Sequence, residues 1–251
     1  MSTPAKQGVT IDIASSACLR YTGPIMSQAI RDMTDALFRR YPCLAPFADR
    51  LSAATEAIVG CHANNGLVLL CGNGGSAADA SHIAGELLKG FLNRRPPSPG
   101  QADLLVREMG DAHLAAKLQR GVRAVNLCEA SSIITATAND LGPELIFAQQ
   151  VFALGRPGDI LIGLSTSGNA ENVTRAMQTA RAVGLTTIGF TGARPGRMDA
   201  FCDLLFKVPE TETYRIQELH LPLYHALCAQ VEAVCFGSHS DAMETTKEKR
   251  E

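Results

Sequence analysis

The chain has 251 residues and a mass of 26.7 kDa, which fits one α/β domain with helical additions. Its 23 Lys and Arg against 25 Asp and Glu give a formal net charge of −2, which argues against a protein that coats nucleic acid. No apolar run is long enough for a membrane helix, the first ten residues do not resemble a signal peptide, and the eight Cys form no CxxC pair. We therefore expect a cytoplasmic globular protein that binds neither membrane nor nucleic acid.

Apolar periodicity predicts an arm over residues 1–24, a main domain over 25–238 and a charged tail over 239–251. The domain opens with two amphipathic helices, at 25–41 and 51–62. From residue 66, short apolar strands alternate with helices, which is typical of a parallel sheet covered on both faces. The expected strands are 67–71, 124–128, 159–165, 185–190 and 204–208, and the expected helices are 76–92, 130–138, 144–154, 170–183 and 212–236.

A polar excursion, residues 93–120, separates the first two expected strands. It begins NRRPPSPG, and its length leaves two interpretations open, a lid over a site or a plain surface excursion. Its arginines and the nearby Arg123 are interpreted as a solvated face. These are Arg94, Arg95, Arg107, Arg120 and Arg123.

Two expected strand-to-helix turns carry glycine and hydroxyl residues. The first reads GNGGSA (72–77) and the second reads STSGN (165–169). Glycines let backbone N–H groups approach an anion, and a helix start adds a favourable dipole. Three consecutive hydroxyls suit the oxygens of a phosphate monoester. Each turn alone is equally well explained by ordinary helix capping, but two such turns at neighbouring strand ends favour an anion site.

The first turn also matches the dinucleotide pattern G-x-G-x-x-A, which is weak in isolation. A dinucleotide-binding unit places an acidic residue about 20 residues further on, where it holds the ribose. Residues 91–99 contain two Arg and three Pro but no acid. A nicotinamide-dependent oxidoreductase is therefore disfavoured.

Two helices carry polar pairs at spacings that place them on one face. His82 and Glu86 are four residues apart, and Gln217 and His225 are eight apart, a little over two turns. Their nitrogen and oxygen atoms suit a divalent ion such as zinc. Capping or subunit contacts explain the same spacings, so both interpretations stay open on spacing alone. His220, three residues after Gln217, is expected to support the site from behind or to contact a neighbouring subunit.

Several longer stretches together resemble the sedoheptulose-7-phosphate isomerases (phosphoheptose isomerases) of the SIS superfamily. The similarity runs from about residue 29 to residue 236. It rests on CGNGGSAADASHIAGEL (71–87), TANDLG (137–142), GDILIGLSTSGNAENV (158–173), LTTIGFTG (185–192) and TYRIQELHLPLYHALC (213–228). The resemblance implies an α/β/α three-layer sandwich with a five-stranded parallel sheet, a homotetramer, and active sites between subunits.

The resemblance also implies roles for residues at the matching positions. Substrate would be held by Asn73, Gly74, Gly75, Ser76, Glu86, Asn139, Asp140, Ser165, Thr166, Ser167 and Gln217, with the three hydroxyl residues on the phosphate. One Zn²⁺ per subunit would be held by His82, Glu86, Gln217 and His225. Glu86 and His225 would also act as catalytic acid–base residues, moving a proton between C1 and C2 of a sugar phosphate through an enediol or enediolate.

Three features depart from the family pattern: Ala170 in place of a serine, Tyr214 in place of an aspartate, and the longer excursion. They leave open whether the substrate is a heptose phosphate or another ketose phosphate. An alternative comes from non-catalytic SIS proteins, which bind sugar phosphates or a protein partner such as a replication initiator. Those proteins lack the glutamate and the late histidine, whereas Glu86 and His225 fill both positions here. The sequence therefore favours an isomerase.

Overall fold

Five short runs of aliphatic and β-branched residues form the strands of one sheet. The computed structural model describes residues 28–237, with strands β1 (Val68–Cys71), β2 (Ala124–Asn126), β3 (Ile160–Leu164), β4 (Thr186–Thr191) and β5 (Leu204–Lys207). Their order is β2-β1-β3-β4-β5, and each neighbouring pair is parallel. The order reverses between β1 and β3, so the loops after these two strands lie where open α/β sheets bind ligands.

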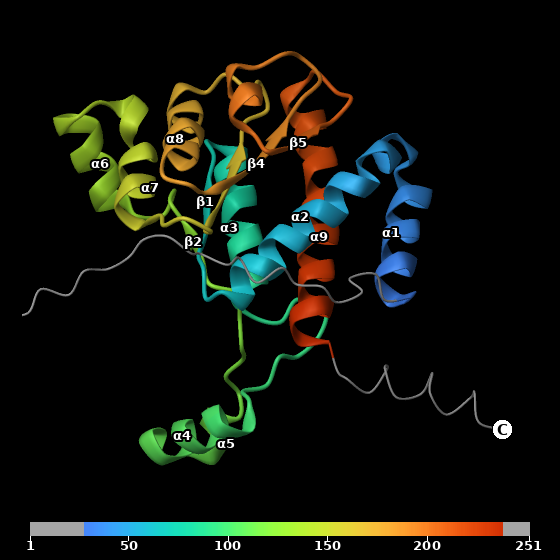
Figure 1. Ribbon diagram of the computed structural model, residues 1–251, viewed down its shortest axis with the longest axis vertical. Helices are drawn as coiled ribbons and strands as arrows, with labels where there is room; N and C mark the ends of the chain where they lie inside the picture. Colours follow the sequence, from blue (N-terminus) through green and yellow to red (C-terminus); the bar gives the residue numbers. More distant parts are fainter. Residues whose placement is uncertain (1–27, 238–251) are drawn as a thin grey trace, which may run out of the picture.

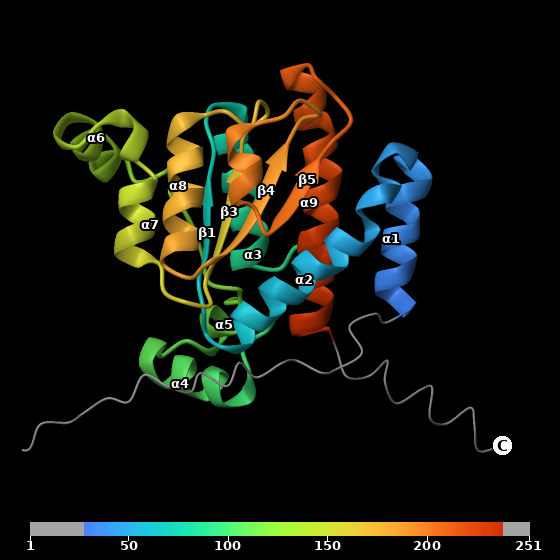
Figure 2. The same cartoon turned by 45° about the horizontal axis from the view of Figure 1, so that its top comes forward.

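Helices cover both faces of the sheet, which confirms the predicted three-layer sandwich (Figures 1 and 2). They are α1 (Gln28–Arg40), α2 (Ala48–Ala63), α3 (Gly75–Leu88), α4 (Pro99–Met109), α5 (Ala112–Ala115), α6 (Ser131–Asp140), α7 (Ala148–Leu154), α8 (Glu171–Ala182) and α9 (Thr213–Phe236), with 3₁₀ turns η1 (Pro42–Phe47), η2 (Pro143–Leu145) and η3 (Arg197–Phe201).

Alternate strand residues enter two separate cores, as the two-residue period of a strand requires. Val68 and Leu70 of β1 join the core formed with α2, α3 and α9. Leu69 and Cys71 join the core formed with α7 and α8. The α2, α3 and α9 layer carries His82, Glu86 and His225, the acid–base residues that the sequence singled out.

Helix α3 ends at Leu88, four residues earlier than expected, and a long-range contact explains the difference. Lys89 is extended, with φ −140° and ψ 175°. The Arg95 guanidinium donates to the carbonyl oxygens of Glu86 and Leu87, both at 2.8 Å. These bonds satisfy two carbonyls that the helix end leaves without an intrahelical donor. The interpretation of Arg95 as part of a solvated face is therefore wrong, since the residue is 1% exposed.

The excursion 93–120 is helical rather than irregular. Ser98 and Gln101 form a capping box at the start of α4, and Gly110, with φ 66°, ends that helix. The two ends of the excursion are joined, because the backbone N–H of Arg120 donates to the Arg95 carbonyl oxygen at 2.7 Å. Both views place α4 and α5 far from the loops after β1 and β3, so within one chain the excursion does not cover them (Figures 1 and 2).

The predicted helix over 144–154 is divided in the structure. Gly142, with φ 122°, and Pro143 start the turn η2, and α7 begins separately at Ala148. The predicted arm and charged tail lie outside the described residues. Within 28–237, no helix combines the length and the apolar character needed to cross a membrane.

Candidate active site

The loop between β1 and α3 is shaped by glycines. A Cβ on Gly72 would lie 2.6 Å from the Ser76 carbonyl oxygen, and Gly74 has φ 55°. Asn73 and Asn172 exchange two side-chain hydrogen bonds, at 2.8 and 3.0 Å, which tie this loop to the start of α8. Asn73, Gly74 and Gly75 are exposed, while Ser76 is buried. The loop therefore presents its backbone to solvent at the N-terminus of α3, as an anion or sugar hydroxyl requires.

The second loop follows β3 at the neighbouring position of the sheet. Gly168 has φ 64°, and a Cβ there would lie 3.0 Å from the Gly196 Cα. Ser165 is buried and Ser167 is exposed, with the Ser167 Oγ accepting from the Asn169 N–H at 3.1 Å. Because β1 and β3 are parallel neighbours, the structure brings the two predicted loops to one edge of the sheet.

A second cluster lies on the facing sides of α3 and α9. His82 Nε2 is 3.3 Å from Glu86 Oε1 and 3.4 Å from His225 Nε2. The Glu86 side chain is 14% exposed, and its Oε2 atom is buried with no hydrogen-bond partner among the described residues. Phe91 packs beside the His225 ring, at 5.5 Å between centroids. Residues from distant parts of the sequence thus converge within one chain.

The electrostatics of this cluster follow from partial burial. Burial lowers the pKa of His225, the His82 ring lowers it further, and the Glu86 carboxylate acts in the opposite direction. Burial raises the pKa of Asp79 against the opposing hydrogen bond from Tyr224. Burial and the neighbouring Asp79 raise the pKa of Tyr224 well above its usual value. An imidazole that is neutral near pH 7 is able both to take and to return a proton.

Gln217 lies closer to the first loop than to the histidines. An added Cβ on Gly75 would come within 2.4 Å of the Gln217 Nε2 atom, so this amide rests directly on the start of α3. Gln217 precedes His225 by eight residues on α9, a rise of about 12 Å along the helix. Its side chain thus links the first loop to the helix that carries His225.

Asn139 and Asp140 stand apart from the other predicted residues. They end α6, are exposed, and share a 2.7 Å hydrogen bond between Asn139 Nδ2 and Asp140 Oδ1. In both views α6 lies beyond α8, away from α3 and α9 (Figures 1 and 2). One chain alone does not bring them to the two loops.

His220 faces the interior of the chain and not a neighbouring subunit. It is fully buried, its Nε2 lies 3.2 Å from the Thr191 carbonyl oxygen, and its ring packs against Phe190. Burial lowers its pKa to about 4. The expectation of a subunit contact is therefore wrong for this residue.

Behind Glu86, sequence reasoning missed a buried ion pair. The Nε of Arg95 donates to Glu232 Oε1 at 2.8 Å, and both side chains are 1% exposed. Glu232 also accepts from the backbone N–H groups of Phe91, Leu92 and Asn93, at 2.7–2.9 Å. The pair holds the end of α3, which falls two residues after Glu86.

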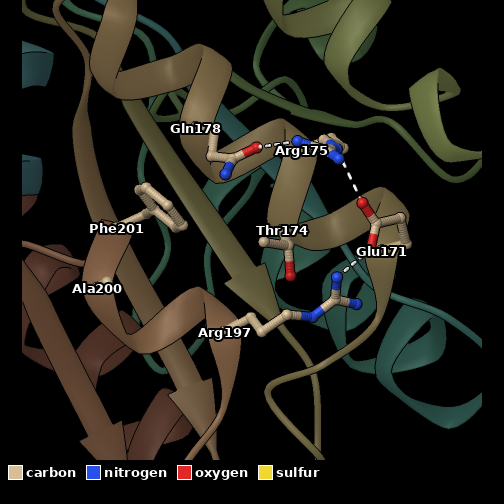
Figure 3. Close-up of a pocket in the computed structure, with 7 residues that line it drawn as sticks. All are labelled: Glu171, Thr174, Arg175, Gln178, Arg197, Ala200 and Phe201. Atoms are coloured by element: carbon tan, nitrogen blue, oxygen red, sulfur yellow. Dashed lines mark hydrogen bonds and ion pairs between the residues drawn. The ribbon is translucent and has the colours of Figure 1, made fainter.

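A hollow of about 320 Å³ lies between α8 and η3 (Figure 3). Glu171 lies between Arg175 and Arg197 at its rim and forms an ion pair with each. Arg197 in turn donates to Asn169, next to the second loop. None of the predicted site residues lines this hollow, which is formed by Glu171, Thr174, Arg175, Gln178, Arg197, Ala200 and Phe201.

The SIS domain family matches the chain over residues 44–126 and 114–192. The phosphoheptose isomerase of Burkholderia pseudomallei strain 1710b is 45% identical over 182 residues, which cover 72% of this chain and 80% of that protein. The phosphoheptose isomerase of Rhodospirillum rubrum is 40% identical over 202 residues, covering 80% and 93%. The chain belongs to the phosphoheptose isomerase family of SIS-domain proteins.

Solved structures agree with this family. The phosphoheptose isomerase of Neisseria gonorrhoeae superposes with a TM-score of 0.63 at 33% identity, covering 82% of this chain and 98% of that chain. The Francisella tularensis phosphoheptose isomerase gives the same TM-score at 29% identity. The family thus makes this chain a sugar-phosphate isomerase, as the sequence predicts.

Proposed function

We propose that the chain interconverts sedoheptulose 7-phosphate and a glycero-manno-heptose 7-phosphate through an enediol or enediolate. The observation that carries the chemistry is the position of Glu86 and His225, which lie 3.3 and 3.4 Å from the same atom of His82. A carboxylate and an imidazole in one half-buried cluster are the two proton carriers that an aldose–ketose isomerisation needs. The identity of the sugar is supported by the similarity to phosphoheptose isomerases.

In this mechanism Glu86 removes the proton bound to carbon, and His225 moves a proton at the adjacent oxygen. The unpartnered Oε2 of Glu86 leaves an acceptor lone pair for the C–H group. The lowered pKa of His225 keeps its ring neutral near pH 7, so that it is able to accept the hydroxyl proton and return it. Since the two loops hold the end of the substrate that carries the phosphate, the binding energy of that end positions the reacting carbons of the sugar.

Substrate binding is assigned to both loops and to α6. We place the phosphate on Ser165, Thr166 and Ser167, beside the N-terminus of α8. The sugar chain is assigned to the remaining predicted residues, which are Asn73, Gly74, Gly75, Ser76, Asn139, Asp140 and Gln217.

A zinc ion fits the donor set of the cluster. Two ligands about 2.0–2.1 Å from a tetrahedral zinc lie about 3.3–3.4 Å apart, which is the spacing of His82 to Glu86 and to His225. Among residues 28–237, however, no three His, Cys, Asp or Glu side chains already close on one metal position. We propose that His82, Glu86 and His225 hold the ion, with Gln217 as the fourth ligand. Bound zinc would stabilise negative charge on the substrate oxygens.

We further propose a homotetramer in which a second copy supplies Asn139 and Asp140 to the site. Exposed apolar side chains on α7 and directly after α6 support an interface at that side, with Phe152 67% and Leu141 53% exposed. The described cysteines are all free, which supports a reducing compartment such as the cytoplasm.

A panel of C5–C7 ketose phosphates in a coupled isomerase assay tests the proposal, with and without a chelator. We expect turnover of sedoheptulose 7-phosphate that disappears on chelation and returns with zinc. Turnover of only a shorter ketose phosphate would make that sugar the substrate in place of sedoheptulose 7-phosphate. Full activity after complete metal removal would exclude zinc from the mechanism. Tight binding of the sugar phosphate without turnover in the metal-loaded protein would favour the non-catalytic alternative.

A further inference from the structure

Tyr224 lies between Asp79 and His82, on the side of His82 that faces away from Glu86 and His225. Its hydroxyl donates to Asp79 Oδ1 at 3.1 Å, and the hydroxyl oxygen of Tyr224 is also 3.1 Å from His82 Nδ1. Tyr224 is 1% exposed, and its ring makes edge contacts with the rings of His82 and His225. Packing therefore fixes the position of this hydroxyl.

A single phenol proton determines the direction of both hydrogen bonds. Because the Tyr224 hydroxyl gives its proton to Asp79, it is only able to accept from His82. His82 Nδ1 must then carry the imidazole proton, so Nε2 has a free lone pair. That lone pair faces the Glu86 carboxylate oxygen, which is itself an acceptor, and lies 3.4 Å from His225 Nε2, whose role depends on its own tautomer. The two facing acceptors, His82 Nε2 and Glu86 Oε1, are 3.3 Å apart and favour a cation or a shared proton between them.

We propose that Tyr224 and Asp79 are positioning residues that hold His82 in its Nδ1–H tautomer, with Nε2 free to bind a cation. The inference rests on the proposed function in taking His82 as a ligand of the catalytic ion. It adds two residues that neither the sequence analysis nor the similarity assigns. Partners of this kind fix the ring of a metal-binding histidine and raise its basicity.

The burial of Asp79 makes the opposite arrangement costly. If Tyr224 donated to His82 instead, Asp79 Oδ1 would lose its donor. The Oδ2 atom of Asp79 is already buried without a partner in the described part of the chain. A buried polar group left without a hydrogen bond costs about 1–3 kcal/mol, and a charged one costs more. That energy favours the Nδ1–H tautomer by roughly tenfold or more.

The tautomer is measurable in the metal-free protein from the ¹⁵N chemical shifts of His82. We expect wild type to show a protonated Nδ1 and a bare Nε2. Tyr224→Phe removes the acceptor, so we expect a mixture in which a protonated Nε2 donates to Glu86. Tyr41→Phe, a change outside the site, serves as the control and should leave the shifts of His82 unchanged. A protonated Nε2 in wild type, or an unchanged tautomer in Tyr224→Phe, would overturn the proposal.

Zinc affinity gives a second readout, by competition with a chromophoric chelator. Loss of a residue that orients a ligand histidine lowers metal affinity about 10–100-fold, and we expect a loss of this size for Tyr224→Phe. Asp79→Asn keeps the shape but removes the charge that attracts the phenol proton, so a smaller loss and a partial tautomer mixture are expected. Asp79→Asn also tests the proposal by itself if Tyr224→Phe does not fold. Equal affinity in the wild type and both variants would contradict the proposal.

Failure of the inference is separable from failure of the proposed function. The tautomer is read without metal or substrate, so it is decided even in a protein that binds no zinc and isomerises nothing. An active zinc enzyme with His82 protonated at Nε2 in its metal-free form would retain the function and exclude the role of Tyr224 and Asp79.

Discussion

The two halves of the candidate site are built in different ways. His82, Glu86 and His225 lie on long helices; the two histidine rings contact each other and Tyr224, and Glu86 lies 3.3 Å from His82. The loops after β1 and β3 present exposed atoms such as those of Asn73 and Ser167, which are held mainly by hydrogen bonds between neighbouring turns. Proton transfer needs atoms held within fractions of an ångström, whereas a phosphate tolerates a looser set of donors. We therefore expect changes in the helical half to lower kcat and changes in the loops to raise KM.

The largest effect is expected at the carboxylate of the helical half. Glu86→Gln removes the base but keeps the size of the side chain, so kcat should fall about 100–10,000-fold while sugar-phosphate binding stays largely intact. Steady-state kinetics and isothermal titration measure the two quantities. Glu56→Gln, an exposed change on α2, is the matched control. Isomerisation near the wild-type rate by Glu86→Gln would remove Glu86 from the role of base.

The next effect concerns the support of the helical half. Glu232→Gln leaves Arg95 buried without its anionic partner, which should lower the free energy of unfolding by about 3–5 kcal/mol. Urea unfolding at one fixed protein concentration measures the change. Glu108→Gln breaks an exposed ion pair with Arg107 and should cost under about 1 kcal/mol. Equal costs for the two variants would show that the buried pair contributes no special support to α3.

The same ion pair predicts a pH dependence. Burial alone would raise the pKa of Glu232, but the N–H groups of Phe91 and Leu92 and the Arg95 guanidinium hold it below its usual value. A lowered folded-state pKa stabilises the protein above the unfolded-state value of about 4.3, and this contribution is lost as the pH falls through the folded-state pKa. The stability difference between wild type and Glu232→Gln should therefore be constant from about pH 7 to 5 and shrink below about pH 4. A difference that grows toward acid would contradict this assignment.

A moderate effect is expected in the loops. Ser167→Ala removes one hydroxyl donor to a phosphate, worth about 1.5–3 kcal/mol, so KM should rise about tenfold or more with kcat nearly unchanged. Initial-rate kinetics separate the two constants. Ser52→Ala on α2 should change neither. A fall in kcat at constant KM would contradict the expectation that the loops act on binding and the helical half on the chemical step.

The smallest effect is expected at the hollow between α8 and η3 (Figure 3). Glu171→Gln weakens ion pairs with Arg175 and Arg197, and the three side chains are 36–57% exposed. Solvent screens such pairs, so the free energy of unfolding should change far less than in Glu232→Gln, and less still at high salt. Urea unfolding at two salt concentrations tests this. If Glu171→Gln lowered the free energy of unfolding as much as Glu232→Gln does, solvent exposure would not explain the difference between the two sets of ion pairs.

Much of the fold was predictable from local patterns. Five apolar runs predicted the strands, and the glycine and hydroxyl residues after two of these runs predicted the two loops. Both signals are local, because β propensity and turn chemistry act over a few residues. The i,i+4 spacing placed His82 beside Glu86 for the same reason. The capping box at Ser98 and Gln101 was a local signal for α4, although the segment was interpreted only as a polar excursion.

The remaining features depend on contacts between distant residues. The end of α3 is set by Arg95 and Glu232, which are 137 residues apart, and neither was distinguishable from a surface charge. Tyr224 lies in an apolar stretch of α9, so its sequence context predicts only a core residue. Its contacts with Asp79 and His82 appear only in the folded chain. Asn139 and Asp140 lie away from the loops within one chain, so no local pattern could show what they contact.

The joined ends of the segment 93–120 have a consequence for how this chain accommodates differences in length. Since the backbones of Arg95 and Arg120 are hydrogen-bonded to each other, the connection from α3 to β2 is already closed at its base. We therefore expect the number of residues beyond that point to be free to change without shifting β2 against β1 or turning Glu86 on its helix. Removal of α4 and α5 together should leave the sheet, His82 and Glu86 in place.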